Sequence, residues 1–108
     1  MLFLVSFICC PSPARAVTGV CENDDGNIAV SIITNDEGQL LDLAVTVDDT
    51  QISRFPEANR SSITLPSYRY KFSAEKNAHQ DALDLDISGD TGHMEYQGKT
   101  FNLECNWQ

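Results

Sequence analysis

The sequence is poor in basic residues: it has seven Lys and Arg against 16 Asp and Glu, which gives a formal net charge of −9 at pH 7. This charge excludes electrostatic binding to nucleic acid, which requires a basic surface. Glycine and proline are also scarce, at six and four residues, and no apolar run approaches the roughly 18 residues that a membrane-spanning helix needs. The 108 residues therefore indicate one small folded domain.

Residues 1–16 have the features of a secretory signal peptide. An apolar stretch, residues 2–10, is followed by a proline-containing segment in which Ala14 and Ala16 occupy the small-residue positions of a cleavage site. Cleavage after Ala16 predicts a periplasmic or secreted domain, residues 17–108, that does not insert into a membrane. That domain has 16 acidic and six basic residues, a net charge of −10.

The mature chain retains one pair of cysteines. Two of the four cysteines belong to the apolar leader, so Cys21 and Cys105 are the only partners left for a disulfide in an oxidising compartment. A bridge between them would close almost the whole domain and stabilise it by roughly 4 to 5 kcal/mol in the loop-entropy account. A zinc site would need further ligands, and His79 and His93 do not have metal-ligand spacing.

Apolar and polar residues alternate with a period of two along the mature chain, which is typical of half-buried β-strands. Turn-forming residues separate these runs at 24–27, 35–38, 89–92 and 97–99. The pattern predicts an all-β domain of seven or eight antiparallel strands, closed as a small barrel or sandwich so that each apolar face is buried. The predicted inward residues are Ile28, Val30, Ile32, Leu41, Leu43, Val45, Val47, Tyr68, Tyr70, Phe72, Leu83, Leu85, Ile87, Met94, Tyr96, Phe101, Leu103 and Cys105.

Four shorter segments have weaker patterns. Residues 51–54 and 62–65 are predicted as two further strands, the second ended by Pro66. Residues 55–61 and 74–81 do not alternate and are predicted as loops, either of which could carry a single helical turn. Loops on a stiff sheet are common places for recognition, so these two are candidate binding surfaces.

No pattern predicts catalysis. The sequence lacks a nucleophile elbow and any grouping typical of a Ser-His-Asp triad, and the disulfide would consume both cysteines. Asp84 and Asp86 lie on the solvated face of a predicted strand, where nothing desolvates them. We therefore expect a protein that is not an enzyme and has no cofactor. A hydrolase that uses a carboxylate pair is one alternative hypothesis.

Acidic turns provide a second alternative, a calcium-dependent structural or adhesive module. Asp24, Asp25 and Asn27 share one turn, and Asp36 and Glu37 share another, and such oxygen donors are the ligands that Ca²⁺ prefers. Neither turn has the spacing of a known calcium-binding loop. Asx-rich turns also form for backbone reasons alone.

The net charge favours a cationic partner, because an acidic domain attracts basic proteins and increases their encounter rate. Aromatic residues alternate with Arg69 and Lys71 near the middle of the chain, and aromatic and Arg residues together are enriched at interfaces. The period of two nevertheless favours the core for the aromatic residues.

The outline of the mature chain resembles the bacterial inhibitors of C-type lysozyme. It shares with them an export signal, a run of antiparallel strands, a Leu-Pro step and a closing strand with a terminal cysteine. The residues that carry this resemblance are Cys21, Leu65, Pro66, Gly98, Lys99, Leu103 and Cys105.

In that family, the stretch after Leu-Pro carries a Ser-Gly-x-x-Tyr-type motif that enters the lysozyme cleft. This sequence has Ser67, Tyr68, Arg69 and Tyr70 there, without the glycine. The resemblance implies an eight-stranded antiparallel barrel, these four residues as the binding site, and a basic secreted hydrolase as the partner. The leading hypothesis is therefore a small exported acidic binding protein, an inhibitor of a cationic hydrolase such as lysozyme.

Overall fold

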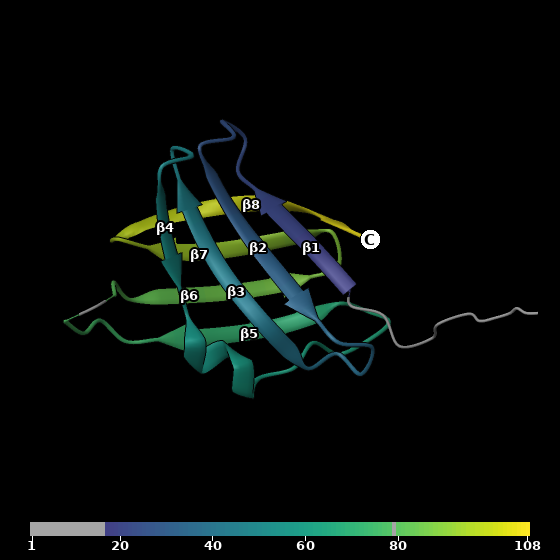
Figure 1. The fold of residues 1–108 in the computed structure, drawn as a ribbon. Coiled ribbons are helices and arrows are strands. Elements are labelled where there is room, and N and C mark those ends of the chain that lie inside the picture. Colours follow the sequence, from purple (N-terminus) through teal and green to yellow (C-terminus); the bar gives the residue numbers. More distant parts are fainter. Residues whose placement is uncertain (1–16, 79) are drawn as a thin grey trace, which may run out of the picture.

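The computed structural model describes residues 17–78 and 80–108 (Figure 1). The predicted signal peptide, residues 1–16, and His79 lie outside the described residues. No helix in the described part of the chain is long and apolar enough to cross a membrane. The elements are β1 (Val17–Glu22), β2 (Ile28–Thr34), β3 (Leu40–Val47), β4 (Gln51–Arg54), the 3-10 helix η2 (Pro56–Arg60), β5 (Arg69–Ala74), β6 (Leu83–Ser88), β7 (Thr91–Tyr96) and β8 (Lys99–Trp107).

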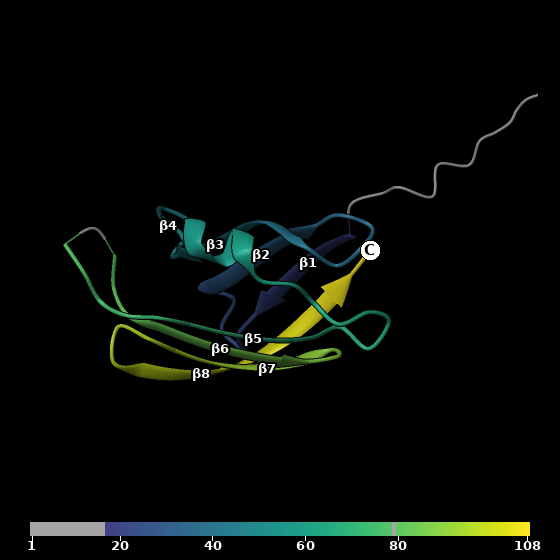
Figure 2. The same ribbon diagram turned by 90° about the horizontal axis from the view of Figure 1, so that it is seen from below.

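The eight strands form one antiparallel sheet in the order β4-β3-β2-β1-β8-β7-β6-β5. The sheet curls into a half-barrel, so that β1–β4 and β5–β8 form two facing layers (Figure 2). Strand β8 joins the layers, because it pairs with β7 along its first part and with β1 along its last. The all-β class and the eight antiparallel strands are thus confirmed, and β4 and β5 form the two edges of the sheet.

Strand β1 has no counterpart among the predicted strands. Residues 17–22 show no clear alternation, because the inward positions are taken by Gly19 and Cys21 rather than by large apolar side chains. Their pairing with β2 and β8 on both sides, rather than a local pattern, makes them a strand. Strand β4 matches the predicted strand at 51–54.

The predicted strand at 62–65 is replaced by two isolated bridges. Ser62 pairs with Gln39, just before β3, and Thr64 pairs with Arg69 at the start of β5. The segment therefore bonds to a different neighbour on each side and makes no continuous ladder with either. It connects the two layers at this end of the half-barrel.

A β-bulge explains the one large error in the predicted inward face. Ile33 pairs with Asp42 and Thr34 pairs with Leu40, so Leu41 has no partner in the register between β2 and β3. The extra residue shifts the alternation of inward and outward side chains by one position at the start of β3. Leu40 is consequently buried, and Leu41, predicted to be inward, is 51% exposed.

The other predicted inward residues lie on the concave side of the sheet. Most are buried, while Val47, Tyr68 and Phe101 are partly buried and pack against the core. Phe55, which follows β4, packs edge to face against Phe72 and Tyr96 of the opposite layer. Burial of these aromatic rings between the layers contributes to their association through the hydrophobic effect.

The two layers are also joined by a hydrogen bond between the hydroxyl groups of Ser53 and Tyr96, 2.6 Å apart. The segment 55–61 forms the short helix η2, which is the single turn that the sequence allowed there, and Ala58 of this helix is buried. Strand β5 ends at Ala74, inside the predicted loop at 74–81.

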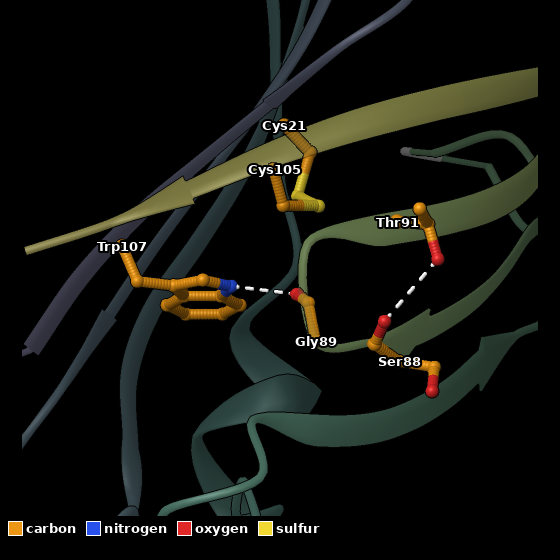
Figure 3. Close-up of a disulfide and its surroundings, with 6 residues drawn as sticks. All are labelled: Cys21, Ser88, Gly89, Thr91, Cys105 and Trp107. Carbon is orange, nitrogen blue, oxygen red and sulfur yellow. Dashed lines mark hydrogen bonds between the residues drawn. A yellow bond between two sulfur atoms is a disulfide. The ribbon is translucent and has the colours of Figure 1, made fainter.

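Cys21 and Cys105 form a disulfide, as predicted (Figure 3). They are direct cross-strand partners in the β1–β8 ladder, with Cα atoms 3.9 Å apart, although 84 positions separate them in the sequence. Both are buried. The bridge therefore links the first and last strands in the middle of the sheet.

Candidate functional site

The predicted binding residues begin in a six-residue loop, residues 64–69, whose last residue is the first of β5. Two backbone hydrogen bonds close it: the N–H of Thr64 donates to the carbonyl of Arg69 at 3.0 Å, and the N–H of Arg69 donates back at 3.3 Å. Inside the loop, the hydroxyl of Ser67 donates to the Thr64 carbonyl at 3.3 Å. The Leu65–Pro66 peptide bond is cis. Pro66 and Ser67 are exposed at the tip.

Tyr68 anchors this loop to the C-terminal strand. Its backbone has a φ of 53°, a left-handed conformation, and its ring stacks on that of Trp107 with centroids 4.7 Å apart and an interplanar angle of 19°. Its carbonyl accepts a hydrogen bond from the N–H of Gly89 at 3.3 Å. Trp107 Nε1 donates to the carbonyl of the same Gly89 at 2.8 Å (Figure 3). The loop and the β6–β7 turn are therefore both held against Trp107.

The six-membered ring of Trp107 also lies against Gly19 of β1. A Cβ atom at position 19 would be only 2.4 Å from Cζ3 of the ring. Gly19 and Trp107 are also cross-strand partners in the β1–β8 ladder. The absence of a side chain at position 19 is thus what allows the ring to lie in this position.

The structure separates the four predicted binding residues into two groups. Ser67 and Arg69 are exposed and Tyr68 is partly buried, so these three lie at the surface, whereas Tyr70 is only 4% exposed and lies in the core. The Tyr70 ring stacks on Phe72. The site that this loop can offer to a partner therefore consists of Ser67, Tyr68 and Arg69.

The buried Tyr70 hydroxyl has no hydrogen-bond partner among the described residues. Burial raises the pKa of Tyr70 to about 12, and the nearby Ser61 hydroxyl opposes part of that shift without lying in hydrogen-bonding geometry. Tyr70 is therefore a neutral core residue at physiological pH.

A shallow hollow of about 340 Å³ adjoins the loop where the segment 61–64 diverges from β5. The side chains of Ser62, Thr64, Arg69, Lys71 and Asp86 are among those that line it. The hollow brings two of the chain's few cationic side chains together with two hydroxyl groups beside the loop.

The outer face of the layer β5–β8 is polar and carries three carboxylates on β6 and β7. Asp84 lies opposite Glu95, and Asp86 lies opposite His93, in the β6–β7 ladder, and all four are exposed. They surround an open hollow of about 300 Å³. The solvated position predicted for Asp84 and Asp86 is confirmed, and the four side chains provide a charged surface on one layer.

The backbone of each acidic turn is held by an asparagine side chain that precedes the acidic residues. Asn23 Oδ1 accepts the N–H of Ile28, and Asn35 Oδ1 accepts the N–H groups of Glu37 and Gln39. Within residues 17–78 and 80–108, no three His, Cys, Asp or Glu side chains are grouped closely enough to hold a metal ion. The hydrogen bonds of Asn23 and Asn35 thus account for the conformation of both turns, and they do not involve the acidic side chains that suggested calcium.

Sequence reasoning did not single out Trp107, Gly19 or Gly89 as parts of the site. One signal for Trp107 was available, because the inward alternation of β8 through Leu103 and Cys105 continues to position 107. The role of Gly19 depends on a contact between the two ends of the chain and has no local signal. In comparisons with known proteins, no family model, no curated protein and no solved structure matched this chain.

Proposed function

We propose that this protein is an exported acidic binding protein that inhibits a cationic hydrolase such as lysozyme without catalysis of its own. The loop 64–69 is the part that would contact the enzyme, through Ser67, Tyr68 and Arg69. The observation that carries this proposal is the construction of the loop. Two backbone bonds close it, and the stack of Tyr68 on Trp107 attaches it to the sheet.

A loop held in this way suits insertion into an enzyme cleft. Binding by a flexible loop loses free energy to the ordering of its backbone and side chains, and a preformed loop avoids much of that loss. The loop projects beyond the end of the two layers (Figure 2), so a partner can reach its tip without contact with the rest of the domain. Pro66 and Ser67 at that tip are exposed.

The charge of the domain supports a basic partner. Residues 17–108 carry a net charge of −10, and the outer face of β5–β8 presents Asp84, Asp86 and Glu95 to solvent. Such a field increases the rate of encounter with a cationic protein and is screened by salt. Arg69 adds a single local cation at the loop, suited to a carboxylate in the cleft of a hydrolase.

The proposal is tested by titration of the purified protein against hen-type lysozyme, with binding and residual hydrolytic activity measured across a salt series. We expect binding that weakens as salt increases and that reduces the activity of lysozyme. Ser67→Tyr, which adds bulk at the exposed tip, should weaken binding at least tenfold, a loss of about 1.4 kcal/mol. The matched control Thr50→Tyr adds the same bulk at an exposed turn between β3 and β4 and should leave binding unchanged.

Two results would overturn the proposal. One is the absence of binding at low ionic strength, where electrostatic attraction is strongest. The other is equal binding by the Ser67→Tyr and Thr50→Tyr variants, which would remove the loop from the interface.

A further inference from the structure

Strand β5 leaves part of its backbone unpaired along the outer edge of its layer. It pairs with β6 on one side and ends the sheet on the other (Figure 1). The N–H and C=O of Arg69 point away from β6 and bond to Thr64. Because backbone groups alternate sides along a strand, those of Lys71 and Ser73 point to the same open side. No segment of residues 17–78 or 80–108 pairs with them there.

We propose that this edge pairs antiparallel with the same edge of a second copy of the chain, around a two-fold axis at Ser73. In that register the backbone groups of Ser73 bond to those of Ser73 in the second copy, and Lys71 lies opposite the second copy's Glu75. Symmetry repeats the Lys71–Glu75 pair on the other side of the axis. The contact is therefore isologous, as a two-fold dimer requires.

The charge order of the segment is self-complementary about Ser73. Lys71, Ser73 and Glu75 are all exposed, with the cation two positions before the axis and the carboxylate two positions after it. The Lys71 side chain forms no ion pair within the described part of the chain. A lysine on an edge strand ordinarily discourages pairing with another strand, but a carboxylate placed opposite it reverses that effect.

The neighbouring segment excludes registers that are shifted toward Arg69. A register shifted toward Arg69 would require the second copy to occupy the place that Thr64 already fills. A ladder centred at Ser73 uses residues 71–75, which lie beyond the segment 61–64, and in it the N–H of the second copy's Lys71 would replace the 3.4 Å hydrogen bond that Gln80 Nε2 donates to the Glu75 carbonyl. On the inner side it places Phe72, which is 7% exposed, beside Ala74 of the second copy and extends the apolar layer across the contact.

The proposal is tested by sedimentation equilibrium of the purified protein at about 0.15 M salt, where the screening length is near 8 Å and limits repulsion between two acidic molecules. We expect a concentration-dependent dimer. Lys71→Glu and Glu75→Lys should each give a monomer, because each places two like charges opposite one another. The double variant Lys71→Glu/Glu75→Lys restores both pairs and should restore the dimer.

Matched controls separate this contact from general charge effects. Lys99→Glu, at the exposed start of β8, and Asp25→Lys, in the exposed turn between β1 and β2, make the same changes in net charge away from β5 and should remain dimeric. Ser73→Pro removes a backbone donor that faces the open edge, where proline is tolerated, and should give a folded monomer. Thermal melts of all variants check that each is folded.

Three outcomes would overturn the proposal: a wild-type monomer up to millimolar concentration, a dimer that the single variants leave intact, or single-variant monomers that the double variant does not rescue. None of them bears on lysozyme binding, which uses the loop 64–69.

Discussion

Replacing Gly19 with alanine should displace Trp107 and loosen the loop that carries Ser67 and Tyr68. The added Cβ would lie 2.4 Å from Cζ3 and 2.5 Å from Cε3 of the indole ring. The backbone at position 19 is held by β2 on one side and β8 on the other. The ring, rather than the strand, therefore has to move.

The cost can be estimated from the two interactions that the displaced ring loses. The hydrogen bond from Nε1 of Trp107 to the Gly89 carbonyl, 2.8 Å long, contributes about 1 kcal/mol net. The stack of Tyr68 on Trp107 contributes about 1 kcal/mol beyond the burial of the rings. The free energy of unfolding should fall by about 2 kcal/mol, which lowers Tm by roughly 8 to 16 °C in a domain of this size.

The fluorescence emission of Trp107 tests this prediction directly, because Trp107 is the only tryptophan in the chain. We expect a red-shifted emission maximum for folded Gly19→Ala and a lower midpoint in urea. Val20→Ala, a truncation at the exposed neighbouring position, serves as the control and should alter neither quantity appreciably. A Gly19→Ala protein with the emission and midpoint of the wild type would refute the assigned packing.

Two further predictions concern the core. The double variant Cys21→Ser/Cys105→Ser should lose roughly 4 to 5 kcal/mol of unfolding free energy, because the bridge closes a long loop; a loss below about 1 kcal/mol in urea titrations would contradict that account. Burial raises the pKa of Tyr70 from an ordinary 10.0 to about 12 in the folded protein. Below pH 10 the hydroxyl is neutral in both the folded and the unfolded chain. As the pH rises from 10 toward 12, the unfolded chain ionises first, so the free energy of unfolding falls. Tyr70→Phe should lessen that alkaline loss while costing little at pH 7, since the hydroxyl has no partner in the described residues; equal alkaline slopes for the two proteins would argue against it.

The strands with strict alternation could be predicted from the sequence because one face of each strand points into the core and the other points to water. In β6 and β7 every predicted inward residue is buried and every predicted outward residue between them is exposed. The alternation failed at Leu41, where a bulge adds a residue to β3. A bulge of this kind depends on the pairing between two strands, and the local sequence of β3 does not indicate it.

The candidate site could be predicted only in part, because its support comes from distant segments. The sequence predicts that Pro66 ends an extended segment, and the structure places Ser67 in a loop directly after Pro66. The burial of Tyr70 agrees with the period-two pattern and removes it from the surface that the resemblance had suggested. The stack of Tyr68 on Trp107 joins residues 39 positions apart, so no local pattern could place them together.

The same two strands provide both the covalent link between the chain ends and the support of the loop. In the β1–β8 ladder the disulfide pair, Cys21 and Cys105, lies two residues from the pair formed by Gly19 and Trp107. Any loosening of β1 against β8 therefore alters the surface on which the Trp107 ring rests, and with it the attachment of Tyr68. The disulfide fixes the position of the loop as well as the fold, because it restrains the strands that hold the ring.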